Sequence, residues 1–566
     1  MSRGGPVVAL AEGDSAGRLL PLGADGTPVG PVERVDDLAA AIVERDRRDR
    51  PRWVWPGTGA SYPALLRAGA RVDRCHDIEL TEALLLGHAG RWGEPRALAA
   101  AWARLTGRPV PADPPTAPAA PPGHRQAALF DTVPRDPGLG PDAVARVYAD
   151  QLARMAAAEH PGRFRLLVAG ESAGALVAVE MATVGLPWRA DLHDAILHDL
   201  LGEPSPVGGP PRRLAELAAR IADAFGVRQI HADSPAEVLR AFARVGVRLP
   251  NTRAYVLRRV EHPAAPLLLE YKELYRIWTA HGWVWRDTWI HDGRFRPEYI
   301  PAGVVSGRWA TRGGGALQIP KVIRKAVVAD PGWRFVVADA GQLEPRVLAA
   351  VSGDVRMAAA GGAGDLYAAL ARDAFDGDRA GAKLALLGAM YGQTGGAAVP
   401  ALAVLRRNYP TAFEFVEAAA RTGEGGGLVR SWLGRTCPPS SVPLRDPERE
   451  YDGGAAEPAM QDEPSRSGAA ARARGRFTRN FVIQATAAEW ATTLLAVLRG
   501  LLAGTPAELV FFQHDEVLVH CPAQLADRVA ELVTEAGRQA TELLFGGTPV
   551  RFPLDISIVD CYADAD

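Results

Sequence analysis

The sequence predicts an α/β domain at the N-terminus followed by a larger α+β region, and three observations support this. Over the first 108 residues, short apolar strands such as 6–10 alternate with helical stretches such as 36–45, an order typical of α/β domains. From about 142 to 294, most apolar residues recur at three- and four-residue spacing, which predicts helices. Beyond Pro301, strands return with helices between them.

Individual elements follow from the same patterns. The clearest helices are predicted at 210–225 and 234–245, where the apolar residues fall on one face. Apolar strands are predicted at 335–338 and 509–512, with helices between them over roughly 365–417.

Two low-complexity segments interrupt these regions. The stretch 109–123 is rich in proline, which predicts an extended, semi-rigid linker. The stretch 446–475 mixes charged residues with Gly, Ala, Pro and Ser, which predicts a flexible insertion. No repeat of solenoid length is found in the sequence.

Composition is that of a globular protein. The 566 residues are 48% hydrophobic and 23% charged, which excludes disordered and fibrous classes. No uninterrupted apolar run of about 18 residues and no apolar signal core are found, so we expect no membrane span and a cytoplasmic location. The four cysteines, Cys75, Cys437, Cys521 and Cys561, are far apart, and we expect incidental thiols rather than a metal or disulfide motif.

Positive charge is local rather than global. The net charge is −2, yet the segments 299–329 and 464–488 contain no acidic residue and five basic residues each. Clustered basic residues on a near-neutral chain indicate local sites for an anion, because the distribution of charge decides what a surface attracts.

A Gly-Glu-Ser-Ala-Gly sequence at 170–174 matches the GxSxG nucleophile elbow of esterases. The match is short, and no upstream oxyanion loop accompanies it. We therefore favour a structural interpretation, a helix that starts and is capped near Ser172.

Two acidic positions indicate a metal site. The strand 333–338 ends at Asp339, and the predicted hairpin 509–519 carries His514, Asp515 and Glu516 at its turn. A strand-end aspartate beside a hairpin-tip aspartate can hold two Mg²⁺ ions for in-line phosphoryl transfer, because Mg²⁺ prefers oxygen ligands.

A third element lies between these acids. Arg379, Lys383, Leu387 and Tyr391 recur every four residues, so on a helix they share one face. Two cations and an aromatic ring on one face suit a nucleoside triphosphate. Taken alone, the spacing favours a surface helix whose cations extend into solvent over a nucleotide site.

Together these segments resemble the family A DNA polymerases, the DNA polymerase I family. Residues 339–346, Asp-Ala-Gly-Gln-Leu-Glu-Pro-Arg, resemble motif A, DYSQIELR. Residues 379–392, with RxxxKxxxxGxxYG, resemble motif B, and residues 513–516, Gln-His-Asp-Glu, resemble motif C. Further matches are Tyr271-Lys272-Glu273-Leu274, Ser306-Gly307-Arg308, Leu317-Gln318-Ile319-Pro320 and residues 479–488.

The resemblance implies roles for particular residues. Asp339 and Asp515 would hold two Mg²⁺ ions, for which Mn²⁺ can substitute, with Glu516 and Lys383 completing the catalytic set. Glu344 would be the sugar gate. The residues implied to contact the nucleotide are Arg379, Lys383, Leu387, Tyr391, Glu344, Gln342 and His514. The residues implied to contact DNA are Arg308, Lys272, Arg476, Asn480 and Gln484.

The sequence departs from the family pattern at four motif positions. Ala340 and Gly341 replace Tyr-Ser, Pro345 follows Glu344, and Leu387 replaces the usual Phe or Tyr. None of these changes removes a metal ligand, so we expect activity and leave fidelity and sugar selection open.

The N-terminal region resembles the 3′–5′ exonuclease-like domain of the family, in a form seen in actinobacterial polymerases. The resemblance rests on Trp53-Val54-Trp55, Tyr62-Pro63 and residues 75–81. A two-metal exonuclease needs four carboxylates, beginning with a DxE triplet on the opening strand. Residues 7–15 contain no DxE, so we expect a degenerate domain, and we expect no separate 5′ nuclease.

The expected fold is therefore a ribonuclease H-like (exonuclease-like) α/β domain at 1–157 and an α+β right-hand polymerase at 158–566. The expected polymerase parts are the thumb at about 190–295, the palm at about 296–353 and 481–566, and the fingers at about 354–480. We expect a monomeric DNA polymerase of replication or repair, associated with the nucleoid, whose partners are primer–template DNA and dNTPs. A non-catalytic DNA-binding protein on this scaffold stays open, and a phage-type RNA polymerase is disfavoured by Glu344 and the His-Asp-Glu sequence.

Overall fold

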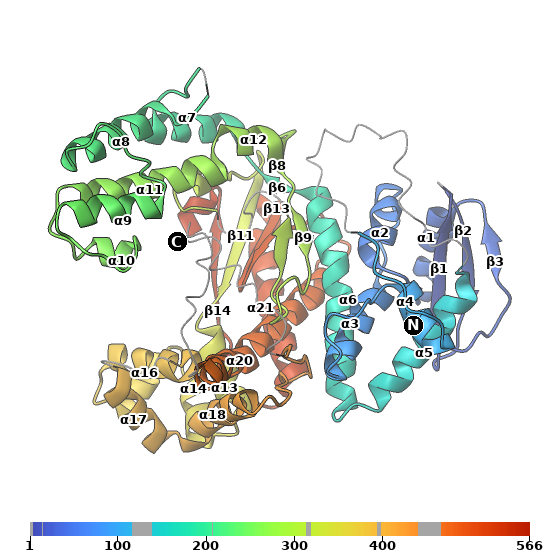
Figure 1. The fold of residues 1–566 in the computed structure, drawn as a ribbon. Helices are drawn as coiled ribbons and strands as arrows, with labels where there is room; N and C mark the ends of the chain where they lie inside the picture. The colour runs from blue at the N-terminus through green and yellow to red at the C-terminus, as the bar shows by residue number, and fades with distance from the viewer. Residues whose placement is uncertain are drawn as a thin grey trace.

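The computed structural model describes residues 4–13, 15–115, 139–206, 208–312, 319–392, 398–439 and 466–565. Figure 1 shows a central sheet with one helical lobe above it, a second below it, and the N-terminal domain to the right. Three of the segments discussed above lie wholly or partly outside the described residues: 116–123 of the linker, Leu317 and Gln318, and 440–465, which takes in most of the expected insertion.

The N-terminal domain is α/β, as predicted. Its five-stranded sheet has the order β3-β2-β1-β4-β5, with β1 antiparallel to β2 and parallel to β4. Trp53 and Trp55 on β4 are fully buried and form part of its core. The strands are β1 (Pro6–Glu12), β2 (Ala16–Pro21), β3 (Glu33–Val35), β4 (Arg52–Trp55) and β5 (Arg74–Asp77). The helices are α1 (Leu38–Asp49), α2 (Thr58–Arg67), α3 (Ile78–His88), α4 (Leu98–Thr106) and α5 (Pro141–Ala156).

Two long helices join this domain to the rest of the chain. Helix α6 (Pro161–Val184) packs on β5, α2 and α3 and also against α20 (Arg466–Leu501) of the C-terminal half. By length and composition α6 and residues 468–501 of α20 could cross a membrane, yet 56% and 83% of their most apolar windows are buried inside the protein. Burial between the two halves accounts for their apolar composition.

The upper lobe in Figure 1 is helical, as predicted for this region. Helix α9 begins at Ser234, whose hydroxyl accepts a hydrogen bond from the amide of Glu237, a standard N-cap. The helices are α7 (Ala190–Leu201), α8 (Arg212–Ala224), α9 (Pro235–Arg244), α10 (Ala254–Leu257), α11 (Ala264–His281) and α12 (Trp283–Trp289). Short strands β6 (Leu186–Pro187), β7 (Ile290–His291), β8 (Arg294–Phe295), β9 (Glu298–Ile300) and β10 (Ala310–Arg312) connect the lobe to the central sheet.

The central sheet is antiparallel, with the order β12-β13-β11-β14. Its strands are β11 (Trp333–Ala340), β12 (Glu508–Gln513), β13 (Glu516–Pro522) and β14 (Leu554–Val559). The other helices are α13 (Leu343–Val351), α14 (Val355–Gly361), α15 (Leu366–Ala374), α16 (Arg379–Tyr391), α17 (Ala398–Asn408), α18 (Pro410–Glu424) and α21 (Ala526–Phe545). All but α21, which packs on the sheet, belong to the lower lobe.

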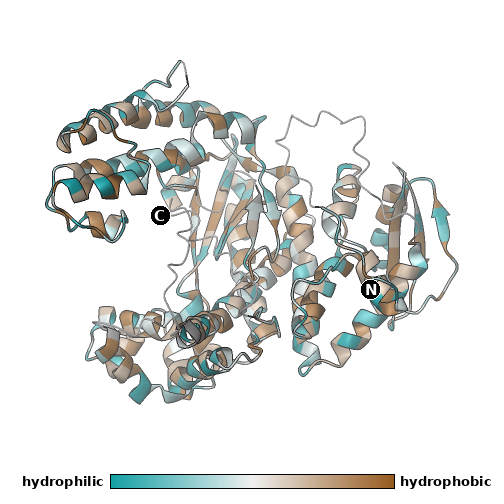
Figure 2. Cartoon of the chain, viewed as in Figure 1, coloured by the Kyte–Doolittle hydropathy of each residue, from teal (hydrophilic) through white to brown (hydrophobic). Residues whose placement is uncertain are grey.

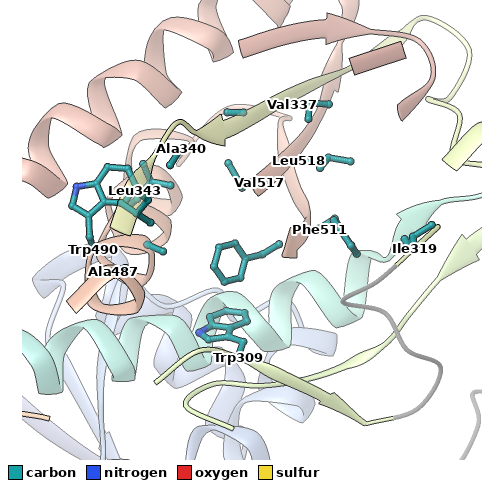
Figure 3. Packing of buried hydrophobic residues seen from close by; sticks show 14 of the residues in the cluster. Trp309, Ile319, Val337, Ala340, Leu343, Ala487, Trp490, Phe511, Val517 and Leu518 are labelled. Atoms are coloured by element: carbon teal, nitrogen blue, oxygen red, sulfur yellow. The ribbon is translucent and has the colours of Figure 1, made fainter. Parts of the chain in front are cut away.

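The apolar interior of this half runs beneath the end of the sheet where β11 ends. Figure 2 shows hydrophobic residues along the strands of the central sheet. In Figure 3, Val337 of β11 and Val517 of β13 lie in one cluster with Trp309 and Trp490. Close packing on this scale makes the strand ends rigid.

Two sequence interpretations are wrong. Residues 170–174 lie in the middle of α6 rather than at a helix start or a strand-to-helix turn, so neither the nucleophile elbow nor a cap at Ser172 exists. Residues 466–475 of the expected flexible insertion are the first turns of α20. Residues 468–473 are mostly exposed, and composition does not show that a helix nucleated further along the chain can propagate through them.

Candidate active site

Carboxylates from three neighbouring strands meet at one end of the central sheet. Asp339, near the end of β11, is paired in register with Glu516 on β13 and with Asp555 on β14. Directly opposed residues of an antiparallel pair point to the same face. Asp515 lies in the β12–β13 turn, and its carbonyl accepts a hydrogen bond from Ala340 N at 3.2 Å. The sequence-predicted pair of aspartates is therefore brought together.

The backbone at this turn is unusual. His514 has a φ of +57°, a left-handed conformation that is uncommon for residues other than glycine but is enriched for histidine. Burial, with help from the charge of Arg308, lowers the pKa of His514 to about 4. Its ring is therefore neutral at pH 7, and it does not compete with a cation for the adjacent carboxylates.

Burial is the main cause that raises the pKa of both Asp339 and Asp515. Burial first, and then the charges of Asp515, Glu516 and Asp555, raise the pKa of Asp339 to about 7. Burial also raises the pKa of Asp515, whereas Arg308 opposes this change. Glu516 is held differently, because its carboxylate accepts a hydrogen bond from the hydroxyl of Tyr562 at 2.5 Å.

The donor set fits Mg²⁺ shared with a substrate. Within the described ranges, no three His, Cys, Asp or Glu side chains come close enough together to hold a metal ion by themselves. Mg²⁺ in phosphoryl-transfer sites is usually held by one or two carboxylates together with substrate phosphates and water. Asp339 and Asp515 supply two carboxylates whose charged forms are disfavoured first by burial and then by neighbouring acids, and a bound dication would favour those charged forms.

Glu344 lies at the centre of a second network. Its carboxylate accepts a hydrogen bond from the Arg308 guanidinium at 2.6 Å and another from the Tyr391 hydroxyl at 2.5 Å. The Glu344 side chain is only 12% exposed. One carboxylate thus connects the loop that carries Arg308 with helices α13 and α16. The sequence resemblance implies that Arg308 contacts DNA and that Glu344 and Tyr391 contact the nucleotide.

The predicted four-residue stripe lies on one helix. Helix α16 is capped by Asp378, which accepts a hydrogen bond from Gly381 N, and it ends at Gly392 in the left-handed conformation, as is common for C-terminal glycines. Arg379, Lys383 and Tyr391 on this helix are exposed, and Leu387 is half-buried. Both cations lie near the ring of Tyr367, at 5.6 Å for Arg379 and 5.9 Å for Lys383.

Gln342, the residue before α13, has a side chain that binds the start of α15 rather than standing free. It has a φ of +59°, its amide donates to Asp365 at 2.9 Å, and its carbonyl oxygen accepts from Leu366 N. Asp365 also forms an ion pair with Arg379 at 2.8 Å. Burial raises the pKa of Asp365, but hydrogen bonds from Gln342, Ala368 and Arg379 outweigh this and lower it.

The residues implied to contact DNA are spread over several elements. Arg476, Asn480 and Gln484 lie at four-residue spacing on α20, and the Arg476 stem packs against Gly392 at the end of α16. Arg308 lies among the acids, as described above. Lys272 lies apart on α11 in the upper lobe (Figure 1), and its ammonium donates to the hydroxyl and carbonyl oxygens of Thr252.

Sequence reasoning missed two acids and a tyrosine near this site. Asp555 could have been found from the strand pattern at 554–559 only if its pairing with β11 were known. Asp365 could have been expected as an N-cap, because its side chain accepts from Ala368 N. Tyr562, three residues beyond β14, carried no sequence signal for its contact with Glu516.

The departures from the motif A pattern are compatible with this fold. Ala340 is 3% exposed and lies in the apolar cluster under the site. Pro345 occupies the first turn of α13, where proline is tolerated because the first amides of a helix have no intrahelical acceptor.

Comparison with known proteins gives a consistent result. A model of DNA polymerase family A matches residues 211–559. Among curated proteins, the thermostable DNA polymerase I of Thermus thermophilus is 26% identical over 345 residues, which cover 54% of this chain and 37% of that protein. DNA polymerase I of Chloroflexus aurantiacus is 26% identical over 311 residues, covering 48% and 30%. The chain thus spans about a third of the length of these curated relatives.

A solved structure described as the polymerase domain of Pol1 from M. smegmatis, in complex with DNA primer–template and dNTP, superposes with a TM-score of 0.68. It is 17% identical in sequence, and the match covers 99% of this chain and 95% of that one. At that identity the similarity establishes the fold. The family model, which spans most of the chain, establishes the relationship: this chain is a member of DNA polymerase family A.

Proposed function

We propose that the protein is a template-directed DNA polymerase that adds dNTPs to a primer 3′-hydroxyl. The observation that carries the proposal is the meeting of Asp339 and Asp515 at the sheet end. The cations of α16 complement it as a site for phosphates. In this proposal the upper lobe, about 190–295, is the thumb. The central sheet with residues 296–353 and 481–566 is the palm, and residues 354–480 are the fingers.

Different residues of the chain would have different roles in this reaction. Lys383 and Arg379 are exposed cations on one helix face, suited to the phosphates of an incoming nucleotide. Tyr391 and Glu344, joined by a hydrogen bond, border the place of the sugar and the templating base. Two Mg²⁺ ions held by Asp339 and Asp515 would activate the primer hydroxyl and neutralise charge on the phosphates. Positioning and electrostatics supply most of the catalysis.

A primed-template extension assay tests this function. Purified protein is incubated with a labelled primer on a longer template, Mg²⁺, and either dNTPs or rNTPs. Extension with dNTPs is expected. Binding of the primer–template without extension would favour the non-catalytic alternative, and extension with rNTPs alone would favour an RNA polymerase. The same preparation analysed by light scattering tests the expected monomer.

Replacing Glu344 by alanine is expected to raise the use of rNTPs relative to dNTPs by about 10- to 100-fold. The carboxylate, fixed by Arg308 and Tyr391, would crowd a 2′-hydroxyl and leave it without a partner. Single-nucleotide insertion rates for the two sugars measure the ratio.

Tyr391→Phe is the matched variant for this measurement. It keeps the ring but removes the hydrogen bond to Glu344, so it should shift the ratio less than Glu344→Ala does. Unchanged sugar discrimination in Glu344→Ala would show that another residue is the gate.

We further propose that the N-terminal domain is exonuclease-like, of the form seen in actinobacterial polymerases, and that it has lost the nuclease site. Three of its described acids serve structural roles. Asp77 caps α3 and accepts from the amide of Thr58 at 2.7 Å. Glu82, which is 1% exposed, accepts from Arg104 and Arg154, and Glu12 is paired with Arg18. Asp14 lies outside the described residues.

No proofreading is therefore expected. The purified protein should leave a 3′-mismatched primer intact in Mg²⁺ or Mn²⁺ without dNTPs, because carboxylates committed to caps and ion pairs cannot hold two metals. Gel analysis of primer length measures this. Shortening that persists in an Asp339→Asn variant but disappears in an Asp77→Asn variant would contradict the prediction and locate a nuclease in this domain.

A further inference from the structure

We infer that Arg435 is a positioning residue for Arg308, and that the buried ion pair between Arg435 and Glu171 sets the place of the primer terminus. The inference rests on the proposed polymerase function, because it concerns how that site is held. It gives a role to residues 170–174, whose Gly-Glu-Ser-Ala-Gly sequence has no nucleophilic function inside a helix.

The Gly-Glu-Ser-Ala-Gly segment is where α6 crosses α20. A Cβ atom on Gly174 would lie 3.1 Å from Thr492 Cγ2 and 3.3 Å from Trp309 Cζ2, so the glycine permits a close approach. The same turn of α6 also faces the N-terminal domain, because Ser172 Oγ accepts from Asp77 N at 3.2 Å. Glu171 is thereby held between the two halves and is 3% exposed.

Glu171 forms an ion pair with Arg435, which is 5% exposed. Arg435 ends a tight turn that starts at Ser431: Ser431 N donates to the Arg435 carbonyl at 2.8 Å, and Arg435 N donates to Ser431 Oγ at 2.9 Å. Glu489 of α20 fixes the same turn, because it accepts from the Ser431 hydroxyl and from Leu433 N. The Arg435 backbone therefore has little freedom, and Glu171 fixes the other end of its side chain.

The guanidinium of Arg435 lies directly against Gly307. A Cβ atom on Gly307 would lie 2.4 Å from Arg435 Nε and 2.6 Å from Arg435 Cζ, so a larger residue there would force the guanidinium to shift. Gly307 also has a φ of +87°, and its amide donates to Val304 O at 2.8 Å. The planar group thus supports the turn that carries Arg308, the next residue.

Arg308 completes the connection to the reacting groups. Its guanidinium donates to Glu344 at 2.6 Å, and its charge acts on both Asp515 and His514. A small displacement of Gly307 would move Arg308 relative to all three residues. Misplacement by about 1 Å can cost up to about 100-fold in rate at a site that depends on alignment.

The experiment must keep the buried charge balanced. Arg435 is the cation beside two buried carboxylates, Glu171 and Glu489, so an alanine there would leave both without a cation and threaten folding. Arg435→Lys keeps the charge but removes the flat guanidinium under Gly307. Arg499→Lys is the matched control, because Arg499 is also a buried arginine, 6% exposed and paired with Glu180 of α6. It contacts the N-terminal domain rather than the Gly307 turn.

The measurements are the maximum rate of primer extension, the dissociation constant for primer–template, and the melting temperature. Arg435→Lys is expected to lower the extension rate at least about tenfold, whereas Arg499→Lys lowers the melting temperature comparably and leaves the rate within twofold. In a background of Arg308→Ala, adding Arg435→Lys should change neither the rate nor the dissociation constant further, because the two residues act through one position.

Two results would overturn the inference. One is that the effects of Arg435→Lys and Arg308→Ala on the extension rate multiply in the double variant. The other is that a destabilised Arg435→Lys protein extends primers at the wild-type rate. If Arg435→Lys does not fold, Glu171→Gln replaces it in the same cycle with the same expectation. If the wild-type protein binds primer–template but does not extend it, the proposed polymerase activity is wrong. The positioning role is then tested separately, by comparing the dissociation constants for primer–template of the wild type, the two single variants and the double variant. Failure to bind would overturn both.

Discussion

Replacing Asp339 or Asp515 by asparagine is expected to lower the rate of primer extension by about 1000-fold or more while primer–template binding stays within a few-fold. Each carboxylate would hold a dication whose charge stabilisation is worth several kcal/mol in the transition state, and each 1.36 kcal/mol is a factor of about ten. Single-turnover extension with saturating dNTP and Mg²⁺ measures the effect.

Asp560→Asn is the control for this pair. Asp560 follows the same strand as Asp555, but its side chain is 66% exposed and pairs with Arg334 at the surface, so its loss should leave extension unchanged. Near-normal turnover by either Asp339→Asn or Asp515→Asn would refute the assignment of that residue as a metal ligand.

The Asp339→Asn substitution should also make the metal-free protein more stable than the wild type at alkaline pH. The pKa of Asp339 is raised from 3.8 to about 7 by burial and by the neighbouring acids. A raised acid pKa means that the folded state keeps a proton that the unfolded state releases, so folding loses stability as the pH rises from about 4 through 7. Asparagine removes this penalty, and in EDTA at pH 8 the Asp339→Asn protein should melt above the wild type.

The parts of the site that lie on continuous segments could be predicted from the sequence. The strand ending at Asp339 and the hairpin around Asp515 have apolar runs bounded by polar turns, a pattern that survives folding because both strands are buried. The α16 stripe was predictable for the same reason, since four-residue spacing places side chains on one helix face.

Contacts between distant segments could not be predicted. Asp555 faces Asp339 only because β14 pairs with β11, and nothing in a single sequence specifies which strands pair. Gly307 and Arg435 are 128 positions apart, and the need for glycine there comes from the guanidinium above it. The Gly-Glu-Ser-Ala-Gly segment misled for a related reason, because small residues serve close helix packing as well as sharp turns.

Arg346→Met is expected to reduce the free energy of unfolding by about 3 kcal/mol or more, because each buried acceptor left without its hydrogen bond costs about 1–3 kcal/mol. Arg346 is 1% exposed, and its guanidinium donates to five backbone carbonyls. Those acceptors are Gly341, Gly361, Ala363, Gly364 and Arg551. Methionine fills the space but donates to none of them, so buried carbonyls lose their hydrogen bonds.

Because these carbonyls lie in loops next to the acids, losing the Arg346 hydrogen bonds is expected to affect the active site as well as stability. Gly341 follows the strand that carries Asp339, and Arg551 precedes the strand that carries Asp555, so one side chain ties together the loops on both sides of the acids. Urea denaturation followed by circular dichroism measures the loss. Arg356→Met is the matched control, because Arg356 is 47% exposed and paired with Asp373. A solvent-exposed pair of this kind contributes little to stability, because water and salt screen its charges. Equal denaturation midpoints for the two variants would show that the Arg346 hydrogen bonds do not hold the loops.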